Sequence, residues 1–262
     1  MGVRRKLGSN YLQCWHCLTA HRTDSVWIRD YGPTLYLDRG KPKLFQYAYY
    51  DRRPRDDDQP RSFADWADLP LTDSGLYMEG GNLLSNGEVC ITSDAVLSFN
   101  FPYTNNVERK RKLLVKALRK YGCAETIVLE SLEDEATGHV DIWLAFASRT
   151  TLIAGVFRED QHAANAAIMG RNLDLLRSRF QIVPIPMPDP VQKRDRLVMR
   201  TYANMLFLND VVLVPTYDGH EAQGVIDAVQ AATGKRVVTF HGENIIKEKG
   251  TIHCLSKTIP RV

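Results

Sequence analysis

The chain has 262 residues, of which 44% are hydrophobic, and its 34 basic and 31 acidic residues leave a net charge of only +3. This composition excludes a disordered or fibrous polymer, and the charge is too small to argue for binding to nucleic acid or to a membrane surface. The sequence contains no run of about 18 apolar residues that could cross a bilayer. We therefore expect a single domain, residues 1–262, in a cytoplasmic protein.

Residues 1–22 form an atypical N-terminal segment whose composition raises the question of a metal site. Cys14, His16, Cys17 and His21 could supply half of a zinc site or a redox pair. Because a structural zinc ion needs four ligands and no second pair follows, we expect neither a metal nor another cofactor. The chain has five cysteines, an odd number that does not suggest a disulfide framework and that fits a reducing compartment.

Units of two strands, a helix and a third strand recur along the chain. Asn–Gly or Asn–Asp turns between short apolar runs predict β-hairpins, and segments with apolar residues at helical spacing follow them. In chain order, the predicted elements are strands at 34–37 and 44–49; strands around the turn at 86–87, a helix over 106–121 and a strand at 126–129; strands at 142–147 and 151–157, a helix over 160–180 and a strand at 181–185; and strands around the turn at 209–210, a helix over 220–232 and a strand at 236–240. A last strand is predicted to follow Gly250 and to end at Cys254.

Polar or reactive residues stand at the same place in each unit. Asp30, Asn82, Asp141, Asn204 and Cys254 follow one another at intervals of about 50 to 60 residues. Self-similarity on this scale indicates a propeller-like or array architecture, and modules arranged around an axis would turn these side chains toward it. Rough hairpin–helix periodicity is also common in α/β proteins, but it gives no reason for functional groups to fall in register.

Five short segments in this order resemble the motifs of the bacterial-type peptidylarginine deiminase and agmatine deiminase family. They are WIRDYGP at 27–33, EGGN at 79–82, HVD at 139–141, YAN at 202–204 and GTIHC at 250–254. The resemblance implies the α/β pentein fold, a propeller of strand–strand–helix–strand modules around a pseudo-fivefold axis. It also implies an active site on that axis and a single catalytic domain.

The resemblance implies hydrolysis of a guanidinium group, which releases ammonia and leaves a ureido group. By motif matching, Cys254 is the nucleophile, His139 the general acid and base, and Asp30 and Asp141 the carboxylates that bind the guanidinium. Two carboxylates can hold the edges of this planar cation and direct its carbon toward the sulfur, which would form a covalent thiouronium intermediate. A buried thiol stays neutral without positive neighbours, so the histidine or the substrate cation must help to ionise it.

Further residues are candidates for binding the substrate. Asn204 is expected beside the nucleophile, and Asn82 and Trp27 belong to the matched motifs. Glu79 is either another polar group of the site or only the residue before the tight turn at 80–81. In a regular strand His253 would point away from Cys254, so we expect it not to be catalytic.

The loop at 51–60 bears on the choice of substrate. Arg53 and Arg55 match arginines that bind the carboxylate of a C-terminal arginine in the peptidylarginine deiminase branch, although a self-neutralising, solvated loop is an equally good interpretation. We expect arginine or peptidylarginine as the substrate, with citrulline as the product. The alternatives are agmatine, which gives N-carbamoylputrescine, an amidinotransferase that uses an amine instead of water, and a pentein that only binds ligands.

Fewer residues precede Trp27 than in other members of the resembled family. The N-terminal or last blade of the propeller is therefore expected to be incomplete, which exposes strand edges and apolar surface. We expect a homo-oligomer or an exchange of N-terminal segments to complete it. The other expected partners are a small guanidino substrate or the C-terminal arginine of a peptide.

Overall fold

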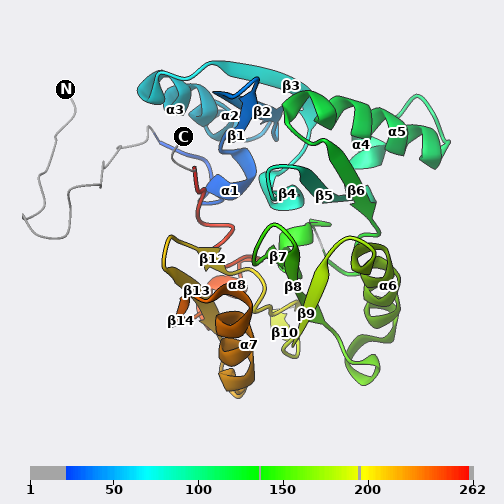
Figure 1. Cartoon of the computed structure of the whole chain (residues 1–262), viewed down its shortest axis with the longest axis vertical. Coiled ribbons are helices and arrows are strands. Elements are labelled where there is room, and N and C mark those ends of the chain that lie inside the picture. The colour runs from blue at the N-terminus through cyan, green and yellow to red at the C-terminus, as the bar shows by residue number, and fades with distance from the viewer. Residues whose placement is uncertain (1–21, 136, 194–195, 260–262) are drawn as a thin grey trace, which may run out of the picture.

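The computed structural model describes residues 22–135, 137–193 and 196–259 (Figure 1). The cysteine and histidine residues at 14–21 lie outside the described residues. In the described part of the chain, none of the helices is long and apolar enough to cross a lipid bilayer.

Four α/β modules follow one another in the described residues, and each contains a three-stranded mixed sheet. In every sheet the first two strands form an antiparallel hairpin, and the third strand pairs in parallel with the second after a helical connection. The first module comprises β1 (Thr34–Asp38), β2 (Lys41–Ala48), α2 (Pro54–Asp57), α3 (Gln59–Ala67) and β3 (Leu71–Tyr77), and α1 (Ile28–Tyr31) precedes it. The predicted α/β organisation is confirmed.

The second and third modules have the same order of elements. The second comprises η1 (Gly80–Asn82), β4 (Leu84–Ser85), β5 (Val89–Ser93), η2 (Asp94–Val96), α4 (Leu97–Asn100), α5 (Val107–Leu118), η3 (Arg119–Tyr121) and β6 (Glu125–Leu129). The third comprises η4 (Val140–Ile142), β7 (Leu144–Phe146), β8 (Thr151–Val156), α6 (Glu159–Arg177) and β9 (Gln181–Pro186).

A separate hairpin leads from the third module to the fourth. It consists of β10 (Val191–Lys193) and β11 (Arg196–Val198), which pair only with each other. The fourth module comprises β12 (Leu206–Phe207), β13 (Val211–Thr216), α7 (Gln223–Thr233) and β14 (Arg236–His241), and the short helix α8 (Glu243–Ile246) follows it.

Turn and cap residues explain where several of these elements begin and end. Gly87 has a φ of 92° in the turn between β4 and β5, a conformation that glycine adopts at little cost. The side chain of Asn106 accepts a hydrogen bond from the backbone N–H of Arg109 at 2.9 Å and so caps the start of α5. Gly234, with a φ of 65°, ends α7.

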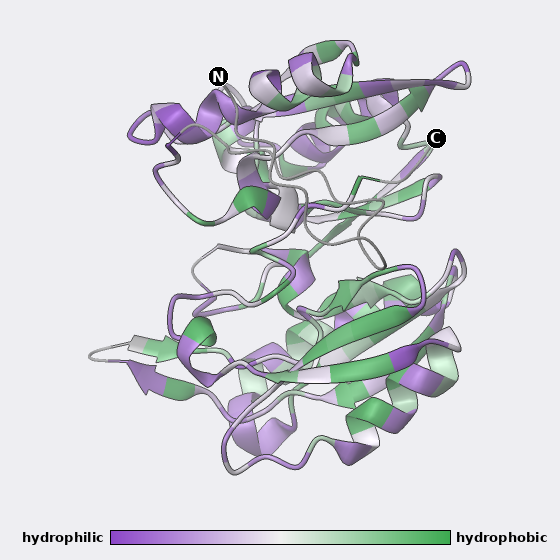
Figure 2. Ribbon diagram, turned by 90° about the vertical axis from the view of Figure 1, so that its left-hand side faces the viewer, coloured by the Kyte–Doolittle hydropathy of each residue, from purple (hydrophilic) through white to green (hydrophobic). Residues whose placement is uncertain are grey.

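The middle strands of the modules carry the core. All five residues of β5 are buried, and Leu152, Ile153 and Ala154 of β8 are completely buried. Burying a leucine or isoleucine side chain stabilises the fold by about 1.5–3 kcal/mol. Figure 2 shows the hydrophobic strands inside and the more hydrophilic helices on the outside. The sheets therefore form the packed interior, and the loops that precede each first strand are anchored to these sheets.

One prediction about the cysteines is wrong, because Cys90 of β5 and Cys123 form a disulfide. Cys90 pairs with Thr126 in the parallel ladder between β5 and β6, and Cys123 lies just before β6 begins. The helical connection between the two strands thus brings residues 33 positions apart side by side. Cysteine spacing alone does not reveal such a pairing, which depends on strand register.

The predicted strand that ends at Cys254 is also wrong. Residues 252–255 form a hydrogen-bonded turn, in which the N–H of Leu255 donates to the carbonyl of Thr251 at 3.1 Å. Asn204 fixes the start of this turn, because its side-chain oxygen accepts hydrogen bonds from both the N–H and the hydroxyl of Thr251, at 3.0 and 2.8 Å. A fifth three-stranded sheet is absent from the residues that the structure describes.

Candidate active site

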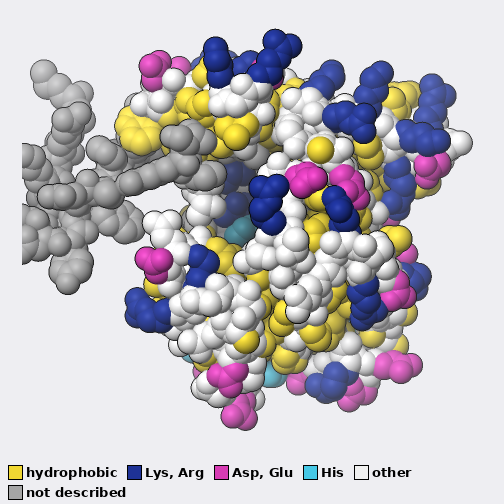
Figure 3. Space-filling view, viewed as in Figure 1, with side chains coloured by type: hydrophobic (Ala, Val, Ile, Leu, Met, Phe, Trp, Pro, Cys, Tyr) yellow, Lys and Arg dark blue, Asp and Glu magenta, His cyan; other side chains and the backbone are white. Residues whose placement is uncertain are grey.

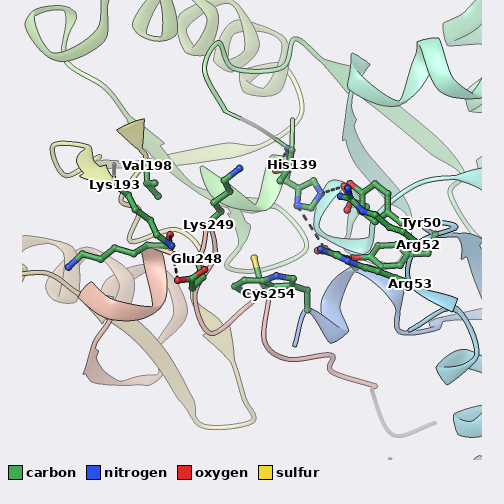
Figure 4. A pocket seen from close by; sticks show the side chains of 15 residues that line it. Tyr50, Arg52, Arg53, His139, Lys193, Val198, Glu248, Lys249 and Cys254 are labelled. Carbon is green, nitrogen blue, oxygen red and sulfur yellow. Dashed lines mark hydrogen bonds and ion pairs between the residues drawn. The ribbon is translucent and has the colours of Figure 1, made fainter. Parts of the chain in front are cut away.

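A cavity of about 620 Å³ opens where the loops before the modules meet the turn at 252–255. In Figure 3 the same face of the molecule is hollowed between the upper and lower modules. Figure 4 shows Cys254 and His139 on the cavity wall. The side chains that line it are those of Trp27, Asp30, Tyr49, Tyr50, Arg52, Arg53, Glu79, Thr137, His139, Lys193, Val198, Lys247, Glu248, Lys249 and Cys254.

Asp30 reaches the cavity from the short helix α1. Its side chain is buried, and its Oδ1 accepts a hydrogen bond from the N–H of Gly81 at 3.1 Å. Burial raises the pKa of Asp30 to about 7, and the nearby carboxylates of Glu79 and Asp141 act in the same direction, whereas His139 opposes them. Asp30 therefore gains its charge close to neutral pH.

Two glycines make room for the polar groups of the site. A Cβ atom on Gly81 would collide with Nδ1 of His139 and would lie 2.9 Å from Oδ1 of Asp30. A Cβ atom on Gly250 would lie 2.8 Å from the ring of Trp27 and 3.1 Å from the sulfur of Cys254. Both positions thus need glycine for space, although neither has a positive φ.

His139 is buried at the start of η4 and is surrounded by carboxylates. Its Nε2 lies 2.9 Å from Oε2 of Glu79, and its Nδ1 lies 3.9 Å from both Asp30 Oδ1 and Asp141 Oδ1. Although burial lowers the pKa of His139, the three acids outweigh it and raise the pKa to about 10. The imidazole is therefore protonated at neutral pH and can donate a proton. The bond to His139 in turn lowers the pKa of Glu79, against the effect of burial.

Asp141 lies between the histidine and the thiol. Its Oδ2 is 2.6 Å from Nδ1 of His253, and Sγ of Cys254 is 3.7 Å from the same oxygen. Burial alone would raise the pKa of Asp141, but the hydrogen bond from His253 and the charges of His139 and Arg29 lower it. Its other oxygen, Oδ1, is buried and has no hydrogen-bond partner among the described residues.

Cys254 is a free, buried cysteine whose sulfur contacts polar groups. The side-chain amide of Asn204 donates to Sγ at 3.2 Å. Burial raises the pKa of Cys254 well above its usual range, and the charges of Asp141 and Asp30 raise it further. The thiol is therefore neutral in the free protein, and a bound cation is needed to stabilise the thiolate.

Two cations, Arg29 and Lys257, lie close enough to Asp30 and Asp141 to interact with their charges. The backbone N–H and the Nε of Arg29 donate to the carbonyls of Cys254 and His253 at 3.2 and 3.1 Å, so Arg29 fixes the turn that carries the sulfur. Lys257 lies 3.1 Å from Thr34 Oγ1, and burial together with Arg29 lowers the pKa of Lys257 to about 7.

The acidic groups of the cavity can hold a cation. Asp30, Glu79 and His139 bring one donor atom each to within 4.8 Å of one another, which is close enough for a metal ion or for the N–H groups of an organic cation. A protonated His139 has no lone pair left for a metal ion, whereas the carboxylates of Asp30 and Glu79 can accept the N–H groups of a planar guanidinium. The arrangement can hold such a group beside the sulfur.

Most of the residues that the sequence singles out meet in this cavity. Trp27, Asp30, Glu79, His139 and Cys254 line it. Asp141 and Asn204 lie directly behind, in contact with the sulfur.

Two of the expected substrate-binding residues lie elsewhere. Asn82 is buried, donates to Ser93 Oγ at 2.9 Å and accepts from the N–H of Ser93, so it supports the loop that leads to His139. Arg55 faces a separate surface depression and lies 3.6 Å from Asp24. Arg53 does line the cavity, where it donates to the hydroxyl of Tyr49 at 2.7 Å.

The sequence reasoning missed His253 and the cationic residues of the C-terminal wall. His253 was expected to point away from the site, but the turn brings its ring to Asp141. Its place next to Cys254 in the matched motif was the available signal. Lys193, Lys247 and Lys249 gave no comparable signal, because they come from a separate hairpin and from the end of α8.

The comparisons with known proteins agree with this geometry. A model of the Porphyromonas-type peptidyl-arginine deiminase family matches residues 3–260. Agmatine deiminases of Ectopseudomonas mendocina and Stutzerimonas stutzeri are 24% and 25% identical to the chain, and each alignment covers 91% of the chain and 75% of the relative. The solved structure of the agmatine deiminase of C. jejuni with substrate bound has a TM-score of 0.75 at 22% identity and covers 87% of this chain and 71% of that one.

Proposed function

The chain belongs to the Porphyromonas-type peptidyl-arginine deiminase family, hydrolases that act on C–N bonds of amidines, and we propose that it deiminates a guanidino compound through Cys254. The observation that carries the proposal is the position of Asp141. It lies 3.7 Å from the sulfur of Cys254 and 3.9 Å from the imidazole of His139, so nucleophile and proton donor flank one carboxylate. Asp30, which lines the cavity, supplies a second carboxylate for the guanidinium.

The first half of the reaction forms a covalent intermediate. Binding of the guanidinium between Asp30 and Asp141 brings a positive charge next to the sulfur, so the Cys254 thiol loses its proton to solvent. The thiolate attacks the guanidinium carbon. His139 then gives its proton to one of the substrate nitrogens, the C–N bond breaks, and ammonia leaves.

The second half of the reaction uses the same groups in reverse. The carbon remains bound to Cys254 as a thiouronium. His139, now neutral, takes a proton from a water molecule, and the resulting hydroxide attacks the carbon. The C–S bond breaks, the leaving thiolate takes up the proton of the new hydroxyl group, and the product carries a ureido group.

The fold supports this assignment, because the site is formed where the modules converge. We infer that the four modules are four blades of the pentein propeller. The structural likeness to the C. jejuni enzyme, at a TM-score of 0.75, supports this arrangement.

The comparisons favour agmatine as the substrate over arginine or peptidylarginine, which the sequence led us to expect. The curated relatives at 24% and 25% identity are agmatine deiminases, and so is the solved C. jejuni structure. Arginine, or a peptide that ends in arginine, is the second candidate, because Arg53 lines the cavity and can meet a carboxylate.

The test is to measure ammonia and ureido-group release from agmatine, arginine and a peptide with C-terminal arginine. We expect release from at least one of them, in equal amounts of the two products. Cys254→Ala should lower kcat by on the order of 10⁴-fold or more, because it removes the group that forms the covalent intermediate. An unchanged rate in that variant, or transfer of the amidino group to an added amine without ureido product, would overturn the proposal.

A further inference from the structure

We propose that Lys249 and Arg52 form an anion subsite at the mouth of the cavity, opposite each other, and that it selects a guanidino substrate whose tail carries two acidic groups. The proposal rests on guanidinium deimination at Cys254. It concerns only the part of the substrate that does not react, and it selects the second candidate substrate, an arginine derivative, over the agmatine that the comparisons favour. Compounds of this class include an arginine acylated with a dicarboxylic acid and a peptide that ends in Asp-Arg or Glu-Arg.

The two walls of the cavity come from opposite ends of the described chain. Arg52 and Arg53 follow β2, whereas Lys249 follows α8. In Figure 4 the arginines lie on one side of Cys254, and Lys249 lies on the other side, together with Lys193 and Glu248. A substrate held at the sulfur by its guanidinium would therefore extend its tail between the arginines and a wall that carries Lys249 and the Lys193–Glu248 ion pair.

The backbone of Lys249 has a conformation that is unfavourable for a residue with a side chain. Its φ is 75°, in the left-handed region that glycine occupies freely and a lysine does not. The N–H of Lys249 donates to the carbonyl of Ile246 at 2.7 Å, so the residue ends the turn that follows α8. Glycine would make this turn without strain. A strained residue on a cavity wall is a reason to look for a role of its side chain.

The other lysines of this wall are already paired. Lys193 lies 2.7 Å from Glu248, and Lys247 lies 3.6 Å from Glu243. In the part of the chain that the structure describes, neither Lys249 nor Arg52 has a salt bridge to a carboxylate.

Arg53 and Arg52 differ in the number of contacts that their guanidinium groups make with neighbouring side chains. Arg53 is bound to the Tyr49 hydroxyl and lies over the rings of Tyr49 and Tyr50, at 5.6 and 5.2 Å from their centres. The guanidinium of Arg52 lies 5.1 Å from the centre of the Tyr50 ring. That contact leaves its N–H groups available for an anion.

Acidic groups therefore lie near His139, and the basic groups Lys249 and Arg52 lie on the two facing walls. Asp30 and Glu79 line the cavity near His139, with Asp141 buried behind it, and the guanidinium would bind there. Lys249 and Arg52 lie along the tail. The ammonium group of agmatine would meet cations there, whereas a tail with two acids can place one on each wall. A cavity of 620 Å³ is larger than agmatine or arginine needs and has room for such a tail.

The experiment measures kcat/KM for substrates that share the guanidinium and differ in the charge of the tail. The series is agmatine, arginine, 4-guanidinobutyrate, N-acetylarginine and N-succinylarginine. It is run on the unmodified chain and on Lys249→Gly and Arg52→Gln. Lys249→Gly relieves the left-handed strain, so its thermal stability should be equal or higher. Lys116→Gln, on the exposed face of α5, removes one positive charge far from the cavity and is the matched control.

We expect kcat/KM to rise along the series as negative charge is added, with N-succinylarginine highest. In Lys249→Gly, the ratio of N-succinylarginine to N-acetylarginine should fall roughly 10- to 100-fold, the size of one charge-assisted hydrogen bond. Arg52→Gln should lower kcat/KM for both acylated arginines together, because Arg52 would meet the carboxylate that they share, and Lys116→Gln should leave both values unchanged.

Failure of this proposal and failure of the deiminase proposal give different results. If agmatine or arginine is turned over well but added negative charge brings no gain, or if Lys249→Gly leaves the ratio unchanged while the variant is folded, the anion subsite is refuted and the deiminase activity stands. If no member of the series releases ammonia, the activity assigned to Cys254 is refuted as well.

Discussion

At the level of single residues, the carboxylates around His139 set the pH range of the reaction. Asp30 must be ionised to hold a guanidinium, and its pKa is raised to about 7. His139 must be protonated to release ammonia, and its pKa is raised to about 10. We therefore expect kcat/KM to increase as the pH rises through 7 and to decrease as it passes 10. A profile that is flat from pH 6 to 11 would contradict these roles.

The variant Glu79→Gln tests what raises the pKa of Asp30 and the pKa of His139. The charge of Glu79 raises the pKa of Asp30 and of His139, so removing the charge should lower both. Both limbs of the profile should move to lower pH, the alkaline limb by about 1 unit or more. Full pH–rate profiles of the variant and the unmodified chain provide the measurement. An alkaline limb that remains at pH 10 would show that Glu79 does not control His139.

The sequence allowed the reacting groups to be predicted, but not the groups that tune them. Cys254, His139, Asp30 and Asp141 lie in short motifs whose residue types already suggest their chemistry. His253 was assigned to the wrong side, because that inference assumed a regular strand where the chain forms a turn. The position of Lys249 depends on a left-handed backbone, which a lysine in a sequence does not signal.

At the level of elements, the glycine in η1 keeps the site open. Gly81→Ala should place its new methyl group against His139 and Asp30, and kcat/KM should drop about 100-fold, because a shift of about 1 Å in a reacting group has an effect of that size. Gly170→Ala in α6 is the matched control. No atom lies within 4 Å of its new Cβ, so activity should persist and stability should rise by about 0.4–1 kcal/mol. Equal activity in the two variants would refute this role of Gly81.

The disulfide between β5 and the start of β6 should stabilise the second module. Cys123→Ser should lower the free energy of unfolding by about 2–4 kcal/mol under oxidising conditions. In the presence of a strong reductant the variant and the unmodified chain should differ much less. Urea unfolding with and without the reductant, together with peptide mapping of the unreduced protein, makes the comparison. Free Cys90 and Cys123 in the oxidised protein would contradict the pairing.

The helices and hairpins of modules two to four follow closely from sequence patterns. The helix expected at 106–121 is observed as α5 and η3, and the one expected at 160–180 as α6. The loop expected at 51–60 instead contains α2 and the start of α3, and the rest of α3 and β3 were not predicted. Pro54 and Pro60 stand in the first turns of these helices, where proline is tolerated, but proline and aspartate are also the residues typical of turns and loops.

At the level of the whole molecule, a substrate bound at the cavity connects all the modules and should stabilise them together. In Cys254→Ala, which cannot react, agmatine at about 100 times its Kd should add about 2.7 kcal/mol. For a chain of this size, that corresponds to a rise in Tm of roughly 5–10 °C. Differential scanning fluorimetry provides the measurement. The double variant with Asp30→Asn should show a much smaller rise, and an equal rise in both would place binding elsewhere.

The hydrogen bond from Arg29 to the carbonyl of His253 joins positions 224 residues apart. Loops of that length close slowly, and contacts of this kind form after local hairpins and helices have already appeared. During refolding from denaturant, far-ultraviolet circular dichroism should recover first, and catalytic turnover should return in a later phase. The reactive thiol would thus be exposed for longer than any helix remains unfolded, which makes alkylation or oxidation during this interval the main hazard of refolding.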